Sequence, residues 1–135
     1  MSRLVHVGVR ASNLEKSIRF WRDLLGLTVV GQGENHYDLT DGRSNFRVFQ
    51  HTGPERPPNV GGMLDYLHIG VLVPDLKEAY ERFVAAGVPI VVDDVYLGKP
   101  YDPNHPPQES FKVADPDGIV IDISANPDQW PGVSP

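Results

Sequence analysis

The sequence predicts an α+β fold built from two units, each with the element order β-α-β-β-β. Three observations support this fold class. The chain repeats itself, so that His6 and His68 occupy equivalent positions. Each copy begins with an alternating, strand-like segment and continues with a helix-like one. Turn signals then separate three further short strands. At 135 residues, the length corresponds to one domain, 1–135.

The repeat is visible in the first strand and helix of each copy. Residues 4–26 read LVHVGVRASNLEKSIRFWRDLLG, and residues 66–87 read YLHIGVLVPDLKEAYERFVAAG. The alignment pairs His6 with His68 and Gly8 with Gly70. Alternation in the first strand places His6 and Gly8 on the face opposite the valines, and the same holds for the second copy.

A predicted helix follows each of these strands. Ser12 and Glu15 have the spacing of a capping box, and so do Asp75 and Glu78. Apolar residues recur at helical spacing after each cap. A glycine then ends each helix, and these glycines are Gly26 and Gly87.

Three short strands are expected after each helix. Their predicted ranges are about 27–32, 36–40 and 45–51, then 89–95, 109–114 and 119–124. The first unit therefore spans 3–52 and the second 64–125. A Pro- and Gly-rich linker, 53–63, joins them, and residues 126–135 form a tail.

Composition excludes several classes of protein and site. The net charge is −6 and basic residues are scattered, which argues against a nucleic-acid partner. No apolar run is long enough for a membrane span, and the start has no signal-peptide pattern, so we expect a cytoplasmic location. The chain has no cysteine, so any metal must be bound by imidazole and carboxylate groups.

Two such units, a histidine on the first strand of each, and a DPDG turn at 115–118 that leads to a carboxylate resemble the vicinal oxygen chelate superfamily. This group includes glyoxalases, bleomycin-resistance proteins and extradiol dioxygenases. The resemblance implies a curved mixed β-sheet that encloses a metal or ligand cavity, with the helices on the outer face. It also implies a small-molecule substrate and a homodimer.

The resemblance assigns three metal ligands. His6 and His68 match the first-strand ligands of the two units, and Asp122 stands where the family usually has a glutamate. Two imidazoles and one carboxylate favour one divalent ion, Fe²⁺ first, with Mn²⁺, Zn²⁺, Ni²⁺ or Co²⁺ as alternatives. The alternative is a polar cavity floor without metal.

Arg47 stands where glyoxalase I has its glutamate ligand, in the segment 46–53. A cation cannot be a ligand, which argues against glyoxalase I and methylmalonyl-CoA epimerase activity. Arg47 either binds an anionic substrate or forms an internal salt bridge. His51 and Tyr66 are the other catalytic candidates. The alternatives are a surface or cavity-rim position for His51 and a pocket or core position for Tyr66.

The sequence thus predicts a metal-dependent enzyme whose small, anionic substrate chelates the metal through two oxygens. An extradiol-type dioxygenase and a lyase, isomerase or transferase all fit. The alternative is a metal-free protein that binds and sequesters a small molecule. The substrate, the use of one chain or two for the site, and a lid function for the Pro-rich loop 98–107 are left open.

Overall fold

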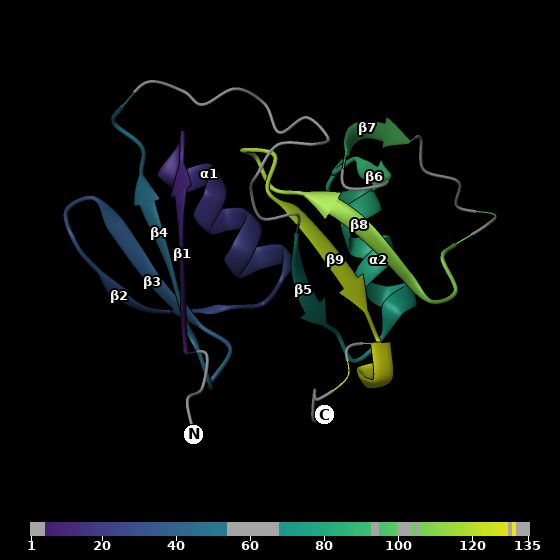
Figure 1. Cartoon of the computed structure of the whole chain (residues 1–135). Helices are drawn as coiled ribbons and strands as arrows, with labels where there is room; N and C mark the ends of the chain where they lie inside the picture. Colours follow the sequence, from purple (N-terminus) through teal and green to yellow (C-terminus); the bar gives the residue numbers. More distant parts are fainter. Residues whose placement is uncertain are drawn as a thin grey trace. The chain divides into compact units, whose positions relative to one another are not determined.

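The structure, a computed structural model, divides into two compact units, Met1–Arg56 and Pro57–Pro135. Each unit has its own mixed β-sheet with a helix (Figure 1). The predicted α+β class is therefore confirmed. Assigning both units to one domain stays a prediction. The residues described are 5–53, 68–92, 95–99, 104, 106–129 and 131.

The first unit has the predicted β-α-β-β-β order. Its strands run in the order β1-β4-β3-β2, with β1 parallel to β4 and the other pairs antiparallel. A π-helical turn, Phe20–Leu24, extends the helix. The elements are β1 (His6–Ala11), α1 (Leu14–Arg19), β2 (Thr28–Gln32), β3 (His36–Thr40) and β4 (Asn45–Gln50).

Local signals at the helix ends explain where α1 begins and stops. The N-cap is Asn13, whose side-chain Oδ1 accepts a hydrogen bond from the Lys16 backbone N–H. The capping box predicted at Ser12 is therefore wrong by one residue. Gly26 follows the helical segment with φ of +76°, a conformation that glycine adopts without steric cost, so this predicted stop is confirmed.

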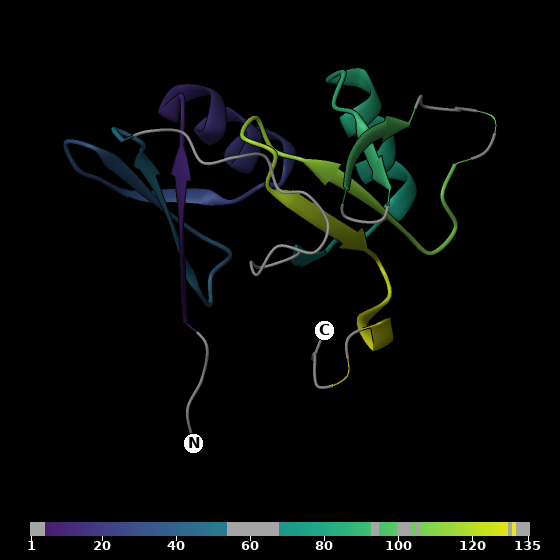
Figure 2. The ribbon, with the colours of Figure 1, turned by 45° about the horizontal axis from the view of Figure 1, so that its top comes forward.

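The core of the first unit lies between the helix and one face of the sheet. Trp21 and Ile18 are buried, as are Leu39 of β3 and Val48 of β4. The Trp21 ring packs 4.2 Å from the ring of Phe46, measured between centroids. Alternation along the strands therefore leaves His6 and its neighbours on the face away from α1. Figure 2 shows α1 on one side of this sheet.

The second unit repeats this arrangement and adds one strand. Its order is β5-β9-β8-β6-β7, with β5 parallel to β9. The predicted strand 89–95 is in fact β6 followed by the start of β7, which pairs with β6 as an antiparallel edge strand. The elements are β5 (Ile69–Leu72), α2 (Leu76–Ala85), β6 (Ile90–Val92), β7 (Val95–Lys99), β8 (Ser110–Ala114), β9 (Val120–Ser124) and a 3₁₀ turn (Pro127–Gln129).

Helix α2 is capped as predicted. Asp75 accepts a hydrogen bond from the Glu78 N–H at 3.0 Å, and Gly87 has φ of +71° after the helix ends. The rings of Tyr80 and Phe83 contact Phe111 of β8, with ring centroids 5.4 Å and 5.9 Å apart. The helix lies behind β8 and β9 in Figure 1.

Both sheets are mixed, as the sequence predicts. In the described residues, the strand pairings form two separate open sheets, one in each unit. Half of the Pro-rich segment 98–107, whose role as a lid the sequence leaves open, lies outside the described residues. No helix in the described part of the chain combines the length and the apolar character needed to cross a membrane.

Candidate metal centre

His6 is the first residue of β1, on the polar face of the first sheet. The parallel register places His6 opposite Asn45 of β4 and Gly8 opposite Arg47. Asp38 of β3 lies opposite Arg47 on the other side. Because cross-strand neighbours share a face, these side chains lie together on the side of the sheet away from α1.

A continuous chain of hydrogen bonds links these side chains. Nδ1 of His6 is 2.6 Å from Oδ1 of Asn45. Nδ2 of Asn45 donates to Oδ1 of Asp38 at 3.0 Å. Arg47 donates to both oxygens of Asp38, from Nε at 2.7 Å and from Nη2 at 2.8 Å. The imidazole of His6 is thereby connected, through Asn45, to the bidentate ion pair of Arg47 and Asp38.

The ion pair shifts the pKa values of both Asp38 and Arg47. Hydrogen bonds from Arg47, and then from Asn45, lower the pKa of Asp38 from 3.8 to about 2. The carboxylate in turn raises the pKa of Arg47. Of the two roles expected for Arg47, the internal salt bridge is present in the structure. A direct catalytic role for Arg47 stays a prediction.

Gly8 leaves space beside the other ring nitrogen of His6. A β-carbon added at Gly8 would lie 3.6 Å from Nε2 of His6 and 3.7 Å from the ring of Phe49. The His6 side chain is exposed, and Phe49 is 38% exposed. Nε2 is therefore accessible to a ligand at a position bordered by an aromatic ring.

Asp122 lies in the middle of β9 in the second unit. It pairs with Gly70 of β5 on one side and with Lys112 of β8 on the other. The residue is only 6% exposed. Its Oδ2 accepts a long hydrogen bond, 3.4 Å, from Nε2 of Gln129. Its Oδ1 is buried and has no hydrogen-bond partner among the described residues.

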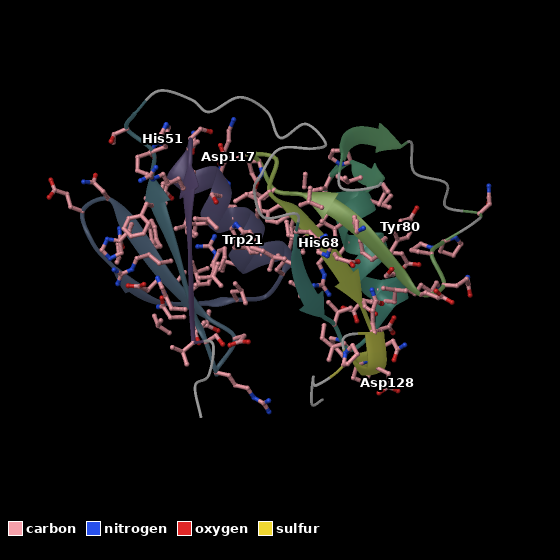
Figure 3. The ribbon with its side chains drawn as sticks, in the orientation of Figure 1. Trp21, His51, His68, Tyr80, Asp117 and Asp128 are labelled. Atoms are coloured by element: carbon pink, nitrogen blue, oxygen red, sulfur yellow. The ribbon has the colours of Figure 1, made fainter. Side chains whose placement is uncertain are left out.

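An unpartnered, buried carboxylate oxygen is unusual because its desolvation is not compensated. A metal ion would satisfy it, so Asp122 fits the ligand role that the sequence predicts for it. His68 directly precedes β5 and is half-buried (Figure 3). It stands two residues before Gly70, so strand alternation places it on the same face as Asp122.

The predicted three-ligand site draws on both units of the chain. Among the residues that the structure describes, no three His, Asp or Glu side chains form a metal-binding cluster. His6 belongs to the first unit, whereas His68 and Asp122 belong to the second. The joint site of all three ligands therefore stays a prediction.

The two remaining candidates lie elsewhere. His51 follows the end of β4, while His6 pairs with the first residue of that strand. At about 3.3 Å per residue, roughly 20 Å of sheet separates them, which does not favour a shared site. Figure 3 shows His51 at this end of β4. Tyr66 lies outside the described residues.

Sequence reasoning missed four side chains around the candidate ligands. They are Asp38, Asn45, Lys112 and Gln129. Lys112 could have been found by counting outward from the DPDG turn, because that turn fixes the pairing of β8 with β9. The positions of Asp38 and Asn45 depend on tertiary pairing, and no local pattern indicates them.

A separate hollow of about 680 Å³ opens at one end of the second sheet. The start of α2, the residues around the beginning of β8 and the turn after β9 line it. His68 and Asp122 are not among its lining residues, so this hollow is not the candidate metal centre.

Comparison with known proteins decides the family. The family description "Glyoxalase/Bleomycin resistance protein/Dioxygenase superfamily" matches residues 3–123 of the chain. The chain belongs to this superfamily. The resemblance to the vicinal oxygen chelate group is thereby confirmed. No match was found among curated protein sequences.

Solved structures agree with membership of the superfamily at the level of the fold. Glyoxalase I of Leishmania major, described as trypanothione-dependent, has 23% identity and a TM-score of 0.66, over 92% of this chain and 86% of that one. Lactoylglutathione lyase of Agrobacterium tumefaciens has 21% identity and a TM-score of 0.58, over 92% and 93%. TioX of Micromonospora sp. ML1 has 19% identity and a TM-score of 0.62, over 91% and 98%.

Proposed function

We propose that this member of the superfamily is a metal-dependent enzyme that uses His6, His68 and Asp122 as ligands. Its substrate is a small anionic molecule that chelates the ion through two neighbouring oxygens. The main support is Asp122, whose Oδ1 is buried and has no hydrogen-bond partner in the described part of the chain. A bound cation supplies the partner that this oxygen lacks.

The chemistry of the three donors supports this assignment. Two imidazoles and one carboxylate leave open positions on an octahedral ion, where substrate oxygens can bind. When bound, the ion supplies Lewis-acid stabilisation of negative charge on those oxygens. Glycines accompany the donors: Gly8 leaves space beside His6, and Gly70 lies opposite Asp122.

An anionic substrate is supported by the second unit. Lys112 lies directly opposite Asp122 in the β8–β9 register. Cross-strand neighbours have β-carbons about 5 Å apart, so Lys112 adds a positive charge to the surroundings of Asp122. A cation at this position favours a substrate that brings its own negative charge to the metal.

The proposed reaction class depends on Arg47, which stands where glyoxalase I has a glutamate ligand. Arg47 pairs with Asp38 and supplies neither a carboxylate ligand nor a base. We therefore propose an extradiol-type dioxygenase, or a lyase, isomerase or transferase, in preference to a glyoxalase I activity. Oxygen consumption on addition of a panel of catechols to the Fe²⁺-loaded protein distinguishes the first of these from the others.

The metal itself is tested first. We expect anaerobically purified protein to bind about one equivalent of a divalent ion, measured by elemental analysis after incubation with Fe²⁺, Mn²⁺ or Zn²⁺. His68→Ala and Asp122→Asn should lose it. His51→Ala and Asp128→Asn are matched controls, because His51 is distant from His6 and Asp128 is exposed in the turn after β9. Full metal content in Asp122→Asn would contradict the proposal.

The second candidate is a metal-free binding protein of the bleomycin-resistance kind. The observation in its favour is the matching family description, which includes bleomycin-resistance proteins. It predicts no stoichiometric metal under any of these conditions. It also predicts that small-molecule binding survives His6→Ala, which thermal-shift screening of an anionic and aromatic compound library can measure.

A further inference from the structure

We propose that Asn45, itself oriented by Asp38 and Arg47, fixes the neutral imidazole of His6 in the tautomer that carries its proton on Nδ1. Nε2 then presents its lone pair to the metal. Asn45 and Asp38 are positioning residues in this scheme. The ligand role of Nε2 rests on the proposed function, whereas the tautomer can be measured without any metal.

The argument begins at Asp38. An ionised carboxylate only accepts hydrogen bonds, and Arg47 only donates them. Arg47 reaches both oxygens of Asp38, at 2.7 and 2.8 Å, and Asp38 is 15% exposed. The low pKa of Asp38 means that it is ionised throughout the neutral range. Asp38 therefore presents a fixed acceptor to its next neighbour.

That neighbour is Asn45, and its amide has two different ends. Because Asp38 can only accept, the amide end facing it must be the Nδ2 donor, which is 3.0 Å from Oδ1 of Asp38. The other end, Oδ1, must then face His6. The orientation of this amide follows from the chemistry of Asp38, which removes the usual ambiguity between amide oxygen and nitrogen.

The amide of Asn45 contacts His6 at Nδ1. Oδ1 of Asn45 is a pure acceptor, and it lies 2.6 Å from Nδ1 of His6. Nδ1 must therefore carry a proton, and in a neutral imidazole the lone pair is then on Nε2. Metal-bound histidines commonly donate their second N–H to a partner in this way.

Nε2 is the ring nitrogen that Asn45 does not engage. It lies next to Gly8, at 3.6 Å from the position that a β-carbon would take there. The His6 side chain is exposed to solvent on this face. The hydrogen bonds thus place the lone pair on Nε2, on the exposed face of the sheet. The ion pair between Arg47 and Asp38 contributes to metal binding in this scheme, because it orients Asn45.

Nitrogen NMR of the metal-free full-length protein tests the tautomer. Spectra of ¹⁵N-histidine-labelled protein, recorded at a pH where imidazole is neutral, distinguish protonated from unprotonated ring nitrogens. His6→Ala identifies the signals of His6. We expect protonated Nδ1 and unprotonated Nε2, the reverse of the form that free imidazole side chains favour. A protonated Nε2 in the wild type would overturn the inference.

Two variants test the cause. Asn45→Ala should return His6 toward the Nε2–H form, and Asp38→Asn should do so in part, because a second amide no longer dictates which way Asn45 points. Asn35→Ala, an exposed asparagine in the same unit, is the control and should change nothing. An unchanged His6 tautomer in both Asn45→Ala and Asp38→Asn would overturn the role of Asn45.

Metal titration separates this inference from the proposed function. We expect Asn45→Ala to weaken Zn²⁺ binding by about 10- to 100-fold, as is typical when the partner of a metal-bound histidine is removed. A wild type without Zn²⁺ binding would contradict the proposed function and leave the tautomer result standing. Normal binding in Asn45→Ala would contradict the positioning role alone.

Discussion

Asp38 accepts three hydrogen bonds, two from Arg47 and one from Asn45. Asp38 of β3 is thereby hydrogen-bonded to both Asn45 and Arg47 of β4. All three side chains lie on the face of the sheet that carries His6. Removing Arg47 would leave a largely covered carboxylate with one hydrogen-bond donor, Asn45, and with Nε2 of His36 at 3.6 Å. We expect Arg47→Leu to unfold at a lower urea concentration than the wild type, because its two charged hydrogen bonds to Asp38 are lost.

The same carboxylate predicts a dependence of stability on pH. Its pKa is about 2 in the folded protein, below the ordinary aspartate value of 3.8 that applies to the unfolded chain. The folded state therefore binds this proton less readily, so the contribution of Asp38 is complete above about pH 4 and is lost as pH falls through 2. The excess Tm of wild type over Asp38→Asn should shrink between pH 5 and pH 2. A constant difference would contradict the prediction.

At the scale of single elements, the two helix caps are equivalent in the repeat. Asn13 and Asp75 each accept a hydrogen bond from a backbone N–H three residues later, at 3.0 Å. We expect Asn13→Ala and Asp75→Ala each to cost about 1 kcal/mol in urea unfolding. An unchanged free energy of unfolding in Asn13→Ala would contradict this assignment.

The caps also illustrate how the sequence can mislead locally. Ser12 and Glu15 have the spacing of a capping box, yet Asn13 is the N-cap. Aligning the two halves of the chain pairs Asn13 with Asp75, which is the cap of the second helix. The internal repeat was therefore the better guide, because it reports on a complete supersecondary unit rather than on one three-residue spacing.

Strand β7 shows a different kind of error. Residues 95–99 overlap the beginning of the segment expected to be a loop. They form an edge strand through pairing with β6. An edge strand has a partner on one side only and a weaker requirement for apolar alternation, so its sequence gives little signal before the pairing is known.

For the molecule as a whole, metal binding should couple to stability. A ligand that binds only the folded state stabilises it by about 2.7 kcal/mol at 100 times its Kd, which for a chain of this length corresponds to a rise of roughly 10 °C in Tm. We expect this rise on adding the preferred ion to EDTA-treated wild type. Asp122→Asn should show little of it, and Asp128→Asn should retain it.

One outcome of the Tm measurement would contradict a metal site at Asp122. An equal rise in wild type and Asp122→Asn would indicate that the ion binds elsewhere, for example at exposed carboxylates. Differential scanning fluorimetry over a series of ion concentrations measures both the size of the shift and its saturation. A saturating shift in wild type alone is the expected result.

The sequence by itself determined the two-unit repeat, the family resemblance and the element order apart from β7. It also determined which side chains share a strand face, because alternation is a local property of the backbone. Alternation alone placed His6 and Asp122 on the polar faces of their strands. The position of Lys112 opposite Asp122 was equally accessible, since one tight turn joins their two strands.

Only the tertiary structure decided what surrounds His6. Asn45 is adjacent to it because β1 pairs in parallel with β4, and the register of two strands this far apart in sequence is set by packing of the helix and sheet, not by a turn. Arg47 illustrates the consequence. The sequence left a substrate contact and a salt bridge equally open, and the β3–β4 register placed it against Asp38.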